Sequence, residues 1–225
     1  RQIAKYGGSN KKRKVYRFPV CALTATAING GVDDSVRETV ISLSMNDPIK
    51  YIGYVKRDDI DFDIQVKSNT KQTKTDYESQ KTHDLSERIE HWLDNDEKTI
   101  VYFPYKILAR NAYECTEQFA ELQDVMDPAL VGLYTGSMHF ASKEAEKVFK
   151  EDAFENFRKG NKMIMFATTA FGMGVDINDI QNVYHYAATG NLADYVQGIG
   201  RAARKTGMKG HAITDYYYND INYMN

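Results

Sequence analysis

Residues 163–176 read Met-Ile-Met-Phe-Ala-Thr-Thr-Ala-Phe-Gly-Met-Gly-Val-Asp, a short apolar run followed at once by a polar loop with two glycines. The run at 163–167 predicts a buried strand. Gly172 and Gly174 allow the loop to bend sharply and to bring its backbone close to a ligand. The sequence therefore predicts a strand that ends in a binding loop, or alternatively an ordinary strand-to-loop turn.

Other short apolar runs alternate with segments whose apolar residues recur at intervals of three and four. Strands are predicted at residues 99–103, 130–134, 163–167, 182–186 and 212–217. Helices are predicted between them, with apolar stripes at Leu85, Ile89 and Trp92, at Leu108, Ala112, Cys115, Phe119 and Leu122, and at Ala145, Phe149, Ala153 and Phe157. This alternation predicts an α/β fold with a parallel sheet and helices on both faces. Ligands of such folds bind beyond the carboxyl ends of the strands, so we expect the loops after Phe103, Tyr134 and Ala167 to share one functional edge.

The first part of the chain is less regular. It contains a predicted strand at 18–23, a helix capped by Asp33, Asp34 or Ser35 that continues to about Leu43, and extended segments at 49–55 and 60–66. Residues 67–83 are almost wholly polar, which predicts a linker or an exposed loop. We therefore expect three parts, namely residues 1–50, a connection over 51–83, and a main domain over 84–225.

Composition limits the classes of function. The 225 residues are 42% hydrophobic, which allows a real core, and no apolar run reaches membrane-spanning length. The net charge of −2 means that any contact with nucleic acid has to be local. Cys21 and Cys115 lie far apart and the histidines lack metal-ligand spacing, so we expect no metal site of the chain's own. Two cysteines fit a reducing, intracellular and therefore cytoplasmic location.

Two groups of polar residues suit phosphate chemistry. Thr168 and Thr169 at a strand end can donate hydrogen bonds to phosphate oxygens, and Asp176 can accept one from a ribose hydroxyl, although it could equally cap the next segment. In residues 197–204, Gln-Gly-Ile-Gly-Arg-Ala-Ala-Arg, the glutamine, the second glycine and both arginines would share one face of a helix. Such a face fits a polyanion, and the simpler alternative is a solvated basic helix end.

A dinucleotide fingerprint is a third interpretation, which would make the protein a Rossmann-type oxidoreductase. Gly198, Gly200 and Ala203 match its spacing, but the fingerprint requires a hydrophobic strand immediately before it. Residues 191–197 instead predict a capped helix.

The order of these motifs resembles that of a known family. Ala-Phe-Gly-Met-Gly-Val-Asp at 170–176, followed by Gln-x-x-Gly-Arg-x-x-Arg at 197–204, is similar to motifs V and VI of superfamily 2 helicases, and in particular of the RecQ branch. Residues 22–27 resemble motif III of that branch, and residues 99–106 lie where its motif IV would be. The resemblance implies a RecA-like domain of an ATP-dependent DNA helicase, with a role in repair and recombination.

The resemblance also implies roles in the nucleotide site. Arg204 would be the arginine finger that reaches the γ-phosphate of ATP, which is held with Mg²⁺ mainly by a preceding first RecA-like domain. Arg201 and Gln197 would contact the same phosphate or brace the finger. The nucleotide side of the loop would be formed by Asp176 near the ribose and by the glycines Gly172, Gly174 and Gly200.

Nucleic-acid roles follow in the same way. The backbone of single-stranded or partly duplex DNA would be contacted by Thr168, Thr169, Thr135, Ser137 and Lys106. Two residues of the motif III region, Thr24 and Thr26, would couple the nucleotide state to strand binding.

Several departures from the family pattern limit the analogy. Ala203 replaces a usual glycine, Tyr105 and Lys106 replace a small polar residue and arginine, and 135–137 replaces a His-Ala-Gly turn. No Gly-x-x-x-x-Gly-Lys-Ser/Thr motif and no acidic magnesium motif at a strand end occurs in the sequence. Because the chain begins at Arg1, we expect those motifs upstream, residues 1–50 as the tail of the first RecA-like domain, and no ATP hydrolysis by this chain alone. A non-catalytic nucleic-acid-binding or regulatory module with the same fold stays open.

Overall fold

The computed structural model describes residues 21–23, 30–31, 34–45, 47–51, 56–137, 142–172 and 176–223. The chain divides into two compact units, residues 1–56 and 57–225, each considered by itself. The first contains α1 (Ser35–Ser42), whose N-cap Asp34 accepts a hydrogen bond from the Arg37 backbone N–H at 2.8 Å, as predicted. Residues 18–20 of the strand expected at 18–23, both coupling threonines (Thr24 and Thr26) and residues 52–55 lie outside the described residues, so those interpretations stay predictions. The described residues 21–23 are not in a strand.

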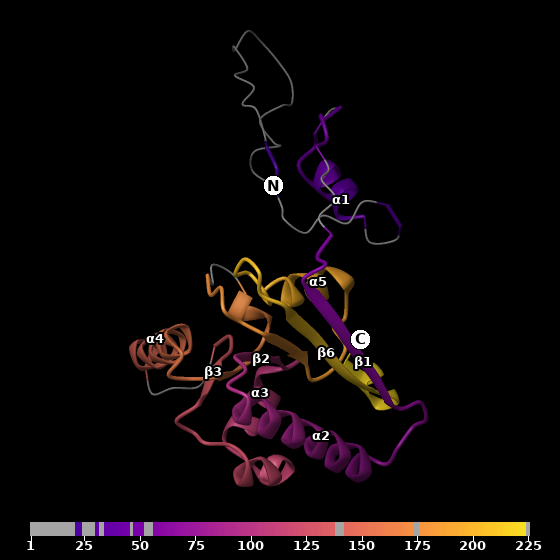
Figure 1. The fold of residues 1–225 in the computed structure, drawn as a ribbon. Coiled ribbons are helices and arrows are strands. Elements are labelled where there is room, and N and C mark those ends of the chain that lie inside the picture. Colours follow the sequence, from indigo (N-terminus) through magenta and orange to yellow (C-terminus); the bar gives the residue numbers. More distant parts are fainter. Residues whose placement is uncertain are drawn as a thin grey trace. The chain divides into compact units, whose positions relative to one another are not determined.

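The second unit is an α/β domain built on six parallel strands (Figure 1). Its strands are β1 (Ile60–Ser68), β2 (Thr99–Tyr102), β3 (Val131–Tyr134), β4 (Ile164–Ala167), β5 (Asn182–His185) and β6 (Gly210–Tyr217), in the order β1-β6-β5-β2-β4-β3. Its α-helices are α2 (Lys74–Asp94), α3 (Lys106–Tyr113), α4 (Lys143–Lys159) and α5 (Leu192–Ile199), and its 3₁₀ segments are η2 (Glu117–Asp124), η3 (Thr169–Gly172) and η4 (Tyr218–Tyr223). The predicted parallel sheet with helices is therefore confirmed.

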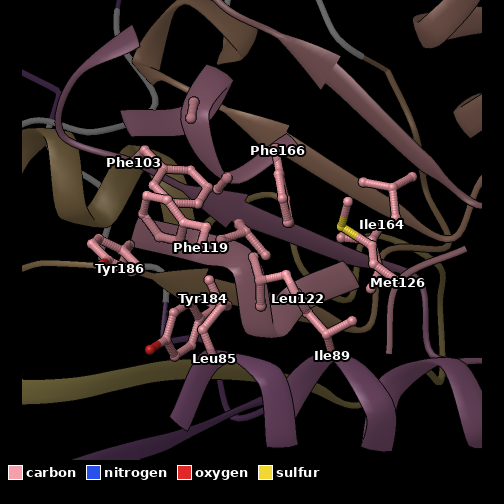
Figure 2. Close-up of a cluster of buried hydrophobic side chains, with 14 of the residues drawn as sticks. Leu85, Ile89, Phe103, Phe119, Leu122, Met126, Ile164, Phe166, Tyr184 and Tyr186 are labelled. Atoms are coloured by element: carbon pink, nitrogen blue, oxygen red, sulfur yellow. The ribbon is translucent and has the colours of Figure 1, made fainter. Parts of the chain in front are cut away.

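Alternate residues of the strands enter two separate cores, one on each face. In β2, Val101 belongs to a cluster with residues of α2, α3 and η2, whereas Ile100 belongs to a cluster with residues of α4 and α5. Figure 2 shows the first cluster, in which Leu85 and Ile89 of α2 lie beneath aromatic side chains that include Phe103 and Phe166. Because both faces are covered at the central strands β2 and β4, these strands need apolar residues on both sides, which explains their apolar runs.

The loop expected over 67–83 is wrong in its second half, because α2 already begins at Lys74. Thr73 caps this helix by accepting a hydrogen bond from the Asp76 N–H at 3.2 Å. The inward face of the added turns carries Tyr77 and Lys81, both buried. Because one of the buried positions is a lysine, the segment has no apolar stripe in the sequence. Its polar composition therefore predicted a solvated loop instead of a helix.

The buried ammonium of Lys81 is balanced by a carboxylate from the far end of the chain. Its Nζ lies 2.7 and 2.9 Å from the two carboxylate oxygens of Asp220 in η4, and neither side chain is exposed. Asp220 also accepts hydrogen bonds from the Tyr77 hydroxyl at 2.6 Å and from the Tyr217 N–H at 3.0 Å. Burial lowers the pKa of Lys81, and Asp220 acts against that shift. The pair ties η4 to α2.

The single helix expected for the stripe from Leu108 to Leu122 is also wrong. The chain leaves α3 after Tyr113, Cys115 adopts a positive φ of 46°, and η2 begins at Glu117. Phe119 and Leu122 are nevertheless fully buried. The periodicity predicted the burial of these residues correctly, because a turn of matching length can join two short helices that cover the same face.

None of the described helices combines the length and the apolar character needed to cross a membrane.

Candidate functional site

The carboxyl ends of four strands meet at one edge of the sheet, as predicted. Tyr102 of β2 pairs with Ala167 of β4 on one side and with His185 of β5 on the other, and Ala167 pairs with Tyr134 of β3. A cavity of about 180 Å³ opens at this edge. It brings together the predicted residues Thr169, Gln197 and Arg201 with Tyr102 and His185.

The motif at 197–204 does not form one helix, which corrects the shared helical face expected for it. α5 ends at Ile199, Gly200 is its C-cap, and Ala203 adopts a positive φ of 53°. Residues 200–204, here called the arginine loop, therefore turn away from the helix axis. Left-handed backbone is disfavoured for alanine by about 1 kcal/mol, so this conformation has to be held by its surroundings.

Hydrogen bonds from other segments hold the arginine loop. The Ala203 N–H donates to the Ile180 carbonyl at 2.9 Å, and the Arg57 guanidinium donates to the Ala202 carbonyl at 2.8 Å. Arg57 is itself paired with Asp59 at 2.8 Å, just before β1. The loop is thus held by Ile180 and by Arg57, which lies 145 positions from Ala202 in the sequence. Arg57 is a positioning residue that the sequence motifs did not reveal.

The two arginines of the loop lie in different environments on the same side of the sheet edge. Arg201 is 4% exposed, and no ion pair joins it to a carboxylate among the described residues. Arg204 is one-third exposed, with Nη1 4.0 Å from the Asp176 carboxylate and Nε donating to the Gly200 carbonyl at 3.3 Å. Burial and the charge of Arg201 lower the pKa of Arg204, and Asp176 opposes this. Two guanidinium groups and one exposed carboxylate, which lies near Arg204, give this part of the edge a net positive charge that suits an anion.

The strand-end loop of β4 brings one of its two threonines to the cavity. Thr169 lines the cavity, whereas Thr168 is almost buried and its N–H donates to the Tyr134 carbonyl at 3.4 Å. Gly172 ends η3, and Gly174 lies outside the described residues. Thr169 is therefore exposed at the cavity, whereas Thr168 is buried at the end of the strand.

His185 and Tyr102 form a buried aromatic floor for the cavity. Their rings stack with centroids 5.5 Å apart, and the ring centroids of His185 and Tyr195 are 4.9 Å apart. Burial lowers the pKa of His185 to about 4, so its imidazole is neutral at pH 7. A Cβ on Gly198 would lie 2.8 Å from His185 Nε2, so only glycine allows α5 to approach this closely. The scattered spacing of the five histidines gives no metal signal, so the sequence alone does not point to His185.

The residues predicted to contact nucleic acid form a second group on the same edge. Lys106 Nζ donates to the Ser137 carbonyl at 3.1 Å, which brings the start of α3 to the loop after β3. Thr135 is only 1% exposed, so little of its side chain is accessible at this edge, and its predicted contact with nucleic acid stays a prediction. Lys150 of α4 donates to the Gly136 carbonyl at 2.6 Å and was missed. Its signal was the lysine spacing of α4, at 143, 147 and 150.

In the described part of the chain, no group of histidine, cysteine, aspartate or glutamate side chains has the arrangement of a metal site. The cations of the arginine loop and the hydroxyl of Thr169 suit a phosphate-bearing ligand.

Known proteins resemble this chain in sequence and in fold. The model of the family described as "Helicase conserved C-terminal domain" matches residues 80–206. The chain is 29% identical over 203 residues to R290 of Acanthamoeba polyphaga mimivirus, a protein named as a candidate ATP-dependent RNA helicase, and this match covers 90% of the chain and 31% of R290. It is 31% identical over 189 residues to the bifunctional 3′-5′ exonuclease/ATP-dependent helicase WRN of Mus musculus, covering 83% of the chain and 12% of WRN. The chain thus spans less than a third of either relative.

Among solved structures, Dbp5 of S. cerevisiae bound to RNA and ADP BeF3 aligns with a TM-score of 0.58 and 20% identity, over 84% of this chain and 44% of that one. This likeness shows the RecA-like fold.

Proposed function

Because the chain belongs to the helicase C-terminal domain family of superfamily 2 helicases, we propose that it acts as the second RecA-like domain of an ATP-dependent DNA helicase of the RecQ-like branch. One observation carries the proposal: Arg201, Arg204 and Asp176 lie together at the sheet edge that also holds Thr169. In this proposal residues 1–50 are the tail of a first RecA-like domain of the same protein, which works in the cytoplasm.

Arg204 is proposed as the arginine finger. ATP with Mg²⁺, bound mainly by the first domain, supplies a phosphoryl group whose negative charge is stabilised by a guanidinium in the transition state. Arginine fingers contribute roughly 10³ to 10⁵ in rate, or about 4 to 7 kcal/mol of barrier. The one-third exposure of Arg204 leaves it able to reach a phosphate, with Asp176 near enough to orient it.

Arg201 is proposed to brace the finger rather than to replace it. Its burial and the neighbouring Tyr102 restrict its movement, and its charge faces the cavity together with Gln197. Gly200 contributes the carbonyl that accepts from Arg204.

The nucleic-acid track is proposed to run past Lys106, Ser137 and Thr169, with Lys150 as an addition. Lysine ammonium groups and a loop at strand ends provide sequence-independent contacts to phosphates. The motif Ala-Phe-Gly-Met-Gly at 170–174 resembles that of RecQ-like DNA helicases and therefore favours DNA as the substrate. The names of R290 and the Dbp5 complex mention RNA instead. Comparing the stimulation of ATPase activity by single-stranded DNA and by RNA of equal length decides between the two.

The test of the motor role is Arg204→Ala in a polypeptide that carries both RecA-like domains. We expect strand-stimulated ATP turnover to fall at least about 10³-fold while strand binding is retained. Arg204→Lys should rescue poorly, because the planar fork is lost. The matched control is Arg158→Ala, which removes an exposed arginine paired with Glu155 on α4 and should keep full turnover. Retained turnover in Arg204→Ala would count against the finger.

A second candidate is a non-catalytic nucleic-acid-binding or regulatory module. It is favoured by Ala203, which holds a positive φ where the family pattern has glycine, and by the altered residues at 105–106. Strand binding without any ATP turnover in the two-domain polypeptide would support this module.

A further inference from the structure

β1 leaves one side of its backbone without a partner strand in the described part of the chain. It stands at the end of the sheet and pairs with β6 alone, as Figure 1 shows. The Gly210 N–H donates to the Asp59 carbonyl at 2.8 Å, so the odd-numbered residues direct their backbone groups toward β6. Backbone groups alternate along a strand, so those of Phe62, Ile64 and Val66 point to the open edge.

The same three residues also carry an uncovered apolar face. Phe62, Ile64 and Val66 are 57%, 59% and 65% exposed, although Ile60 on the same face is buried among residues that include Ile199 of α5. Exposed apolar side chains on a long edge strand are unusual in a solitary domain, because they invite pairing with another strand.

The strand at the opposite end of the sheet, β3, is protected against pairing with a further strand, unlike β1. β3 has only four residues, and the ammonium of Lys162 donates to the Val131 carbonyl at 2.6 Å. Lysines and short strands are the usual means of blocking an edge. β1 has nine residues and none of its edge-facing residues is charged.

We propose that β1 is a self-association site, at which a second copy of this chain adds its own β1 in antiparallel orientation about Ile64. In this register Ile64 lies opposite Ile64, Phe62 opposite Val66, and Asp61 opposite Lys67. Backbone groups that point to the edge meet in hydrogen-bonded pairs, apolar side chains meet apolar ones, and two opposite-charge pairs form.

Neighbouring registers are less favourable. An antiparallel pairing about Asp63 places that carboxylate opposite its own copy, which is destabilising. A pairing about Gln65 leaves Phe62 opposite Ser68. Asp61 is exposed, and Lys67 lies 3.3 Å from Asp84, where the second copy's Asp61 adds a further carboxylate. The register about Ile64 is the one of these three that places Phe62, Ile64 and Val66 opposite one another and Asp61 opposite Lys67.

The first test is the sedimentation of the chain at concentrations from about 1 to about 100 µM, the range expected for a small interface. We expect a dimer that Ile64→Lys converts to a monomer. The matched control is Val148→Lys on α4, which changes an equally exposed valine and should leave the dimer intact. A wild-type monomer throughout this range, or loss of the dimer in both variants, overturns the proposal.

The second test addresses the register. Asp61→Lys should raise the dissociation constant of the dimer about tenfold, because two attractive pairs become repulsive, and adding Lys67→Asp should restore it. Ile64→Cys should form an intermolecular disulfide, since the Cα atoms of a hydrogen-bonded pair lie about 5.5 Å apart. Phe62→Cys should not, because Phe62 does not face its own copy. A disulfide through Phe62→Cys and not Ile64→Cys, or one formed equally in the wild type through its own cysteines, overturns the register and with it the proposal.

Discussion

Acidification should destabilise the second unit through His185, the buried imidazole beneath the cavity. Its side chain is 2% exposed, and burial lowers its pKa from 6.5 to about 4. The folded protein therefore binds this proton more weakly than the unfolded chain does. Between about pH 4 and pH 6.5 the unfolded state holds more protons, so the free energy of unfolding rises with pH through that window and falls on acidification.

The magnitude follows from the two pKa values. With 6.5 in the unfolded chain and about 4 in the folded protein, the loss between about pH 7.5 and about pH 5 is about 2 kcal/mol. Urea titrations at the two pH values measure it. The fluorescence of Trp92, the only tryptophan and a buried one, reports unfolding.

His185→Asn isolates this contribution. The variant loses packing at both pH values, but its stability should depend less on pH than that of the wild type, by about 2 kcal/mol over the same interval. Glu121 raises the pKa of His83, which acts in the opposite direction, but His83 is present in both proteins and cancels. An equal pH dependence in the two proteins would refute the reasoning.

Two further predictions concern buried contacts. Lys81→Met leaves the Asp220 carboxylate buried without its cation, so it should lower the free energy of unfolding, measured in urea, by about 3 kcal/mol. Arg158→Met removes an arginine from an exposed ion pair and should leave the urea midpoint unchanged. Equal effects of the two substitutions would contradict the argument. Gly198→Ala places a Cβ 2.8 Å from His185 Nε2, and overpacking of about 1 to 3 kcal/mol should exceed the gain in helix propensity of about 1 kcal/mol. A raised urea midpoint in that variant would show that His185 moves aside.

The sequence predicted the sheet well because its strands are buried on both faces. In Val101, Phe103 and their neighbours, uninterrupted apolar runs report both cores at once. It failed where a charge faces inward, as at Lys81, and where a turn preserves the periodicity, as at Cys115. Both failures depend on contacts between distant segments, which local patterns do not contain.

The sequence identified residues of the candidate site but did not predict their backbone geometry. The motif at 197–204 identified the two arginines, and the expected proximity of Arg204 to Asp176 is present at 4.0 Å. The helical face expected for the motif was wrong, because hydrogen bonds from Arg57 and to Ile180 impose a turn on it. The roles assigned to these residues in ATP hydrolysis and strand binding stay predictions.

The ion pair between α2 and η4 bears on where this unit can be cut. The matched family region ends at residue 206, before β6 and before Asp220. A polypeptide trimmed to that limit would keep both arginines but lose β6, which pairs with β5, and the Asp220 carboxylate that is bonded to the Lys81 ammonium. The region that carries the recognisable motifs is therefore shorter than the region whose residues pack together. The last residues of the domain hold α2 in place through the ion pair between Asp220 and Lys81.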